Sequence, residues 1–63
     1  MTGHIFTAYE KNRIMCWWVL GDSYELIADK VEEDMGWRVT AREMENKINK
    51  WRLYWSADNL FED

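Results

Sequence analysis

Three segments of the chain space their apolar residues three or four positions apart, as one face of an α-helix requires. In the second segment this face consists of Tyr24, Ile27, Ala28, Val31 and Met35, and in the third of Ala41, Met44, Ile48, Trp51 and Trp55. The first segment is less regular, with Ile14, Trp17 and Trp18 as its apolar anchors. These patterns predict helices over about residues 7–20, 23–35 and 40–55, followed by a tail, residues 56–63, without a clear period.

Helix-capping residues mark the ends of these segments. The first and third segments each open with T-x-x-E, a capping box in which the threonine hydroxyl and the glutamate carboxylate accept each other's backbone N–H. The two boxes are Thr7-Ala8-Tyr9-Glu10 and Thr40-Ala41-Arg42-Glu43. Asp22 or Ser23 is a suitable N-cap for the second segment. Gly21 and Gly36 follow the first two segments, where a left-handed residue usually ends a helix.

The connections between the predicted helices are short. Residues 37–39 join the second helix to the third, which suits a helix-turn-helix with a large crossing angle better than an extended hairpin. Phe6, just before the first cap, is placed to act as a hydrophobic staple. We therefore predict an all-α fold, a compact three-helix bundle of helix-turn-helix type that forms a single domain, residues 1–63, with a short C-terminal tail.

Composition excludes several classes of protein. With 63 residues, 48% of them hydrophobic, the chain is too apolar for a disordered tail and too small for a walled active site. It has no run of 18 apolar residues, and its first residues lack the basic and apolar regions of a signal peptide, so we expect neither a membrane span nor a signal peptide. The one cysteine, Cys16, lies in an apolar run and is expected to be inert, and the one histidine, His4, is expected to be solvated. We expect a non-enzymatic, intracellular protein of the nucleus or cytoplasm, with no cofactor, no metal and no small-molecule substrate.

Motifs in all three segments resemble Myb/SANT-like domains, which are trihelical, homeodomain-like helix-turn-helix domains. Phe6-Thr7-x-x-Glu10-x-x-x-Ile14 is similar to their opening, and Tyr24-x-x-Ile27-Ala28 to the start of their second helix. Thr40-Ala41-x-x-Met44-x-Asn46-Lys47-Ile48-x-Lys50-Trp51 is similar to their third helix. A fungal silencing-type helix-turn-helix family looks similar too, through Gly36-Trp37 and the Lys-Trp ending. The resemblance spans roughly residues 6–55.

The resemblance implies duplex DNA binding through the third helix, in transcription or chromatin. The positions that match the exposed face of that helix in the family are Arg42, Asn46, Asn49 and Lys50. Asn pairs with adenine and Arg or Lys with guanine, so these residue types suit base reading. Expected phosphate contacts come from Arg38, Lys47, Arg52 and, at the helix N-terminus, Thr40.

The distribution of charge agrees with this placement. Residues 36–52 carry five basic and two acidic groups, whereas the whole chain carries 8 basic and 12 acidic residues, for a net charge of -4. Positive charge is therefore concentrated in the third helix, as a recognition helix requires. The acidic remainder predicts weak binding by a lone copy, which a dimer or a larger assembly would strengthen.

A second function from a different class stays open, that of a small acidic protein-binding module. Such a module would be an adaptor, a homodimer or a viral-type inhibitor of a larger host machine. Trp17, Trp51 and Trp55 fit the apolar stripes, the first two as core residues, whereas Trp18 and Trp37 lie off them. An exposed tryptophan in so small a domain suggests a contact surface, which Trp18, Trp37 or Trp55 could form. The candidate partner-binding residues are Trp18, Trp37, Trp55, Leu60 and Phe61. The acidic run 32–34 is the other candidate, against its plainer interpretation as a solvated helix face.

Overall fold

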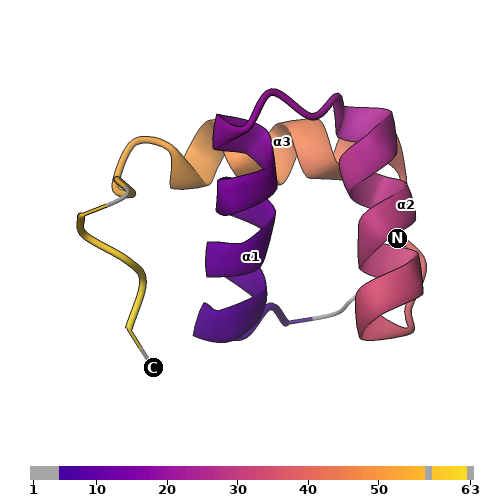
Figure 1. Cartoon of the computed structure of the whole chain (residues 1–63), viewed down its shortest axis with the longest axis horizontal. Coiled ribbons are helices and arrows are strands. Elements are labelled where there is room, and N and C mark those ends of the chain that lie inside the picture. The colour runs from indigo at the N-terminus through magenta and orange to yellow at the C-terminus, as the bar shows by residue number, and fades with distance from the viewer. Residues whose placement is uncertain (1–4, 57, 63) are drawn as a thin grey trace.

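The computed structural model describes residues 5–56 and 58–62, so His4 and the last tail residue, Asp63, lie outside the described residues. It contains three α-helices in this part of the chain: α1 (Ala8–Val19), α2 (Tyr24–Met35) and α3 (Ala41–Trp51). Figure 1 shows α1 and α2 side by side in opposite directions, α3 lying across them, and the tail returning beside α1. The described residues form no strand, only an isolated antiparallel bridge between Ser56 and Asn59. The predicted all-α three-helix fold is confirmed.

The predicted helix caps form as the sequence indicates. At α1 the Thr7 N–H donates to Glu10 Oε1 (2.9 Å), and the Glu10 N–H donates to Thr7 Oγ1 (3.1 Å). The second capping box joins Thr40 and Glu43 at the start of α3 in the same way. Ser23, not Asp22, caps α2, because its hydroxyl accepts the N–H of Leu26.

Both glycines that were expected to end helices adopt the left-handed conformation. The φ angles are +97° at Gly21 and +80° at Gly36. Gly36 is the C-cap of α2, and its N–H donates to the carbonyl of Glu32. A residue with a Cβ is disfavoured at such φ values, which is why glycine occupies both positions.

The third helix is shorter than predicted. It ends at Trp51, and the chain continues through a turn in which the Tyr54 N–H donates to the Trp51 carbonyl. Trp55 keeps the helical spacing of the apolar stripe but lies outside the helix. The turn redirects the chain toward α1, where the Trp55 indole N–H donates to Asn12 Oδ1 at 2.9 Å. The contact with α1 therefore stabilises an early helix end that the spacing alone does not indicate.

The core lies where the three helices meet. Its ten buried hydrophobic residues are Phe6, Ile14, Met15, Ile27, Ala28, Val31, Val39, Met44, Ile48 and Trp51. Six of these side chains are fully buried, each contributing on the order of 1.5–3 kcal/mol of hydrophobic free energy. Phe6 is more than a staple at the helix start, because its ring packs edge-on against Trp37 (4.9 Å) and Trp51 (5.0 Å).

The two tryptophans that were assigned to the core differ in burial. Trp51 is 7% exposed, as predicted. Trp17 is half-buried, and its ring is covered by the guanidinium of Arg13 (5.2 Å) and the ammonium of Lys30 (5.6 Å). None of the helices in the described part of the chain is long and apolar enough to cross a membrane.

Candidate nucleic-acid interface

The solvent side of α3 carries the residues that were proposed to read DNA. Met44, Ile48 and Trp51 attach the opposite side of this helix to the core. Arg42, Asn46 and Asn49 are exposed and follow one another at spacings of four and three. This spacing places them on one stripe that faces away from the core. We call Arg42, Asn46 and Asn49 the α3 stripe.

Basic residues flank the α3 stripe on both sides. Lys47 and Lys50 are exposed on the side of α3 that approaches α1, where they line a shallow hollow together with Lys11. Arg52 is exposed on the other side, beyond the C-terminal end of the helix. An α-helix is about as wide as the DNA major groove, so residues on its two flanks are positioned near the two phosphate backbones.

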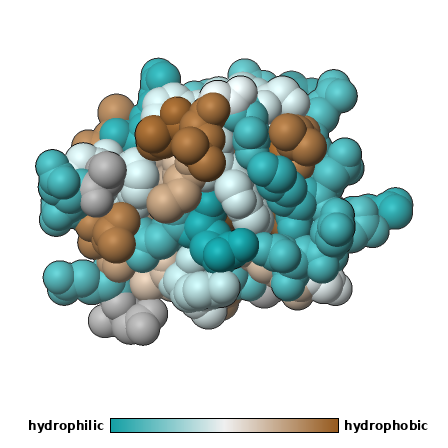
Figure 2. Space-filling view, in the orientation of Figure 1, coloured by the Kyte–Doolittle hydropathy of each residue, from teal (hydrophilic) through white to brown (hydrophobic). Residues whose placement is uncertain are grey.

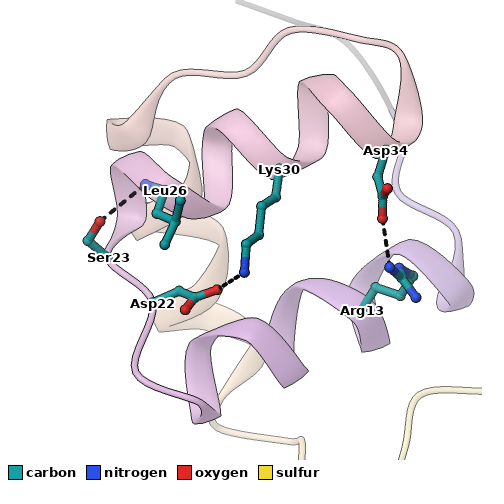
Figure 3. Close-up of polar contacts among 6 residues, drawn as sticks. All are labelled: Arg13, Asp22, Ser23, Leu26, Lys30 and Asp34. Carbon is teal, nitrogen blue, oxygen red and sulfur yellow. Dashed lines mark hydrogen bonds and ion pairs between the residues drawn. The ribbon is translucent and has the colours of Figure 1, made fainter.

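The basic residues divide into those with an acidic partner and those without one. Arg13 pairs with Asp34 (2.6 Å) and Lys30 with Asp22 (2.5 Å), as Figure 3 shows, and Arg38 pairs more loosely with Glu32 (3.5 Å). In residues 5–56 and 58–62, no carboxylate forms an ion pair with the other five basic residues. These five are Lys11, Arg42, Lys47, Lys50 and Arg52. Four of the five belong to α3 or to its C-cap, so uncompensated positive charge gathers around that helix.

Two of the residues predicted to contact phosphate already have a carboxylate of the protein beside them. The Thr40 N–H and hydroxyl both lie 3.3 Å from Glu43 Oε1, so a carboxylate holds the position that a phosphate would take at the start of α3. The guanidinium of Arg38 is exposed but lies beside Glu32. A second anion at either position would meet negative charge, so neither Thr40 nor Arg38 is a good phosphate contact.

Carboxylates also border the α3 stripe at its N-terminal end. Arg42 lines a broad, open hollow that also contains Glu25 and Glu45. Neither carboxylate is within ion-pair distance of Arg42, yet both carry negative charge to the same surface. The C-terminal half of α3, with Lys47 and Lys50, is therefore the more favourable half for phosphate.

The proposed partner-binding residues are mostly packed against the protein itself. Trp18, Trp37, Trp55 and Phe61 are half-buried and lie against the core, whereas Leu60 is 50% exposed. The Trp37 indole N–H donates to Glu10 Oε2 at 3.3 Å, and Trp55 donates to Asn12. The exposed large hydrophobic residues are mainly others: Ile5, Tyr9, Val19, Leu20, Leu26, Leu53, Tyr54 and Leu60. On the face in Figure 2, apolar side chains form separate groups among polar ones.

The acidic run at the end of α2 is largely compensated. All three residues are exposed, but Glu32 pairs with Arg38 and Asp34 with Arg13, which leaves Glu33 as the one of the three without an ion pair among the described residues. The hydrogen bond to Asp34 raises the pKa of Arg13 above its ordinary value. The run is therefore mainly a solvated helix face with two cross-links to neighbouring segments, and not an open acidic patch.

Asn12 is a residue that the sequence pattern did not indicate. Its Nδ2 donates to the Phe61 carbonyl (3.0 Å), and its Oδ1 accepts from the Trp55 indole and from the Phe61 N–H, both at 2.9 Å. These three bonds attach the tail to α1.

The described residues contain no group of three possible metal ligands, and Cys16 is exposed, not enclosed by the apolar run around it.

Comparison with known proteins adds no relative. No protein-family model, no curated protein and no solved structure matches the chain.

Proposed function

We propose that this protein binds duplex DNA, with α3 in the major groove. The proposal is carried by the basic residues that have no acidic partner within residues 5–56 and 58–62 and that surround an α3 stripe with two exposed asparagines. Soluble proteins commonly compensate surface charge with nearby opposite charge, as the pairs of Arg13 and Lys30 do here. The resemblance of the sequence motifs in residues 6–55 to Myb/SANT-like domains is in line with the same function.

In this arrangement the α3 stripe contacts the base edges, and the flanking cations bind the phosphate backbone of the DNA. Asn46 and Asn49 have side chains that pair with the adenine edge, and Arg42 suits guanine. Lys47 on one flank and Arg52 on the other neutralise phosphates on the two sides of the groove. Lys50, which was expected to read bases, lies in the hollow with Lys47 and is therefore assigned to phosphate as well. The acidic remainder of the chain makes the expected affinity of one copy low and strongly dependent on salt.

The test is binding to a labelled mixed-sequence duplex, measured by fluorescence anisotropy from low to physiological salt. We expect binding that weakens steeply with salt. The double variant Asn46→Ala/Lys50→Ala should lose sequence preference and most of its affinity while keeping its circular dichroism spectrum. Asn59→Ala/Lys30→Ala is the matched control, because it removes one amide and one cation away from α3. Absence of binding even at low salt would refute the proposal.

A second function, contact with a protein partner, is favoured by one observation. Tyr9, Cys16, Trp17 and Leu60 line a hollow of about 340 Å³ between α1 and the tail, and its lining is mainly apolar. An apolar contact of this kind depends little on salt, in contrast to DNA binding. Leu60→Glu should abolish partner binding at this hollow and leave duplex binding unchanged, which separates the two functions.

A further inference from the structure

We propose that Lys11, Lys47 and Lys50 form a phosphate-binding site between α1 and α3. They line one hollow of about 250 Å³, with Phe6 and Trp51 as its apolar wall. Given DNA binding by α3, on which this inference rests, the ligand is a backbone phosphate of the duplex beside the recognition helix. Lys11 is the new element, since it comes from α1 and lies outside the third-helix pattern.

Two of the three ammonium groups, those of Lys11 and Lys47, are held near one aromatic cluster. Lys11 Nζ lies 6.0 Å from the ring centroid of Trp51 and 5.3 Å from that of Phe61, and Lys47 Nζ lies 5.9 Å from that of Phe6. The Phe6 and Trp51 rings are themselves 5.0 Å apart. These distances are within the range of cation–π attraction, which favours positions over the rings. Two cations from different helices are therefore placed on neighbouring rings.

The site has positive charge without internal compensation. Glu10 is adjacent to Lys11 in sequence, and Glu43 lies four positions before Lys47, but their carboxylates accept bonds at the starts of α1 and α3. Glu45, two positions before Lys47, lines the other hollow, beside Arg42. In the described chain, none of the three lysines has a carboxylate at ion-pair distance. Like charges that converge without a counter-ion repel each other, and a bound anion removes that repulsion.

The aromatic wall decides which part of a nucleic acid fits. Phe6 is 8% and Trp51 7% exposed, so neither ring offers a face on which a base could stack. The groups that remain accessible are the ammonium donors, which bind phosphate as point charges. The hollow therefore suits the sugar-phosphate backbone, and it lies on the flank of α3 that approaches α1.

The decisive variant is Lys11→Gln, with Lys30→Gln as a control that removes the same charge at a position on α2. Both are titrated with the labelled duplex between about 50 and 200 mM salt. Loss of one phosphate contact should reduce the slope of log K against log salt by about 0.9, which is about 8-fold in affinity at 0.1 M salt. The loss should be the same for all duplex sequences, and Lys30→Gln should leave the slope unchanged. If the duplex binds and Lys11→Gln keeps the wild-type slope, the inference is overturned while DNA binding stands.

Titration with inorganic phosphate separates this inference from the proposed function. In NMR spectra we expect phosphate to shift the signals of Lys11, Lys47 and the Trp51 indole in the wild type, and not in Lys11→Gln. Those shifts in a protein that binds no duplex would support the phosphate site and refute DNA binding. Absence of both the phosphate shifts and duplex binding would overturn the two together.

Discussion

Replacing Asn12 by alanine should detach the C-terminal tail from α1. The side chain makes three hydrogen bonds, one from the Trp55 indole and two with the backbone of Phe61. All three bonds are partly buried, so alanine would leave the Trp55 indole N–H and the backbone N–H and carbonyl of Phe61 without these partners and only partly accessible to water. Trp55 and Phe61 also lie against the core, and they would lose part of that packing.

The expected cost of this change is large for so small a protein. A hydrogen bond contributes about 1 kcal/mol net, so three of them contribute about 3 kcal/mol. Undocking of the tail would expose the unpaired groups to water and limit the loss, and we therefore expect a decrease of about 2–3 kcal/mol in the free energy of unfolding. Chains of this length have total stabilities of roughly 3–9 kcal/mol, so Asn12 holds a substantial share.

Two measurements test this reasoning. Urea denaturation followed by tryptophan fluorescence gives the free energy of unfolding, and NMR gives the hydrogen exchange of the Phe61 amide and the Trp55 indole. Asn12→Asp keeps the acceptor for the Trp55 indole but replaces the donor to the Phe61 carbonyl with an oxygen that repels it, so the Trp55 indole should stay more protected from exchange than in Asn12→Ala. Asn59→Ala is the control, because this exposed amide makes no side-chain hydrogen bond within the described residues. A loss below about 0.5 kcal/mol for Asn12→Ala, with unchanged exchange at Phe61, would refute the argument.

Three further variants test other parts of the structure. Gly36→Ala should lower the free energy of unfolding by about 1–2 kcal/mol in urea titrations, because φ is +80° there and the space around it is open, so conformational strain is the only cost. Ile48→Ala should lower the free energy of unfolding by about 2–5 kcal/mol, because it leaves a cavity at a fully buried position of the core. Thermal unfolding measures this loss, and a much smaller value would mean that neighbouring side chains fill the cavity. Glu45→Gln should raise duplex affinity by up to about 8-fold at 0.1 M salt, and an unchanged anisotropy titration would place the DNA away from this side of α3.

The sequence by itself determined the three helices, because their signals are local. Each capping box joins residues only three positions apart, and the apolar spacing of α2 and α3 fixes which side of each helix is buried. Gly21 and Gly36 mark helix ends for the same local reason, since only glycine tolerates their φ values easily. The exposed side of α3 followed directly, and its predicted base-reading residues are all accessible.

Only the tertiary structure decided which of these residues have partners. Asn12 and Phe61 are 49 positions apart in the sequence, so no local pattern indicates their bonds or the early end of α3 that accompanies them. The same holds for the approach of Lys11 to Lys47 across the rings of Phe6 and Trp51. Arg38 looks as available as Lys50 in the sequence, yet Glu32 lies beside it. Charge compensation depends on distances in space, and these distances are fixed only when the three helices pack together.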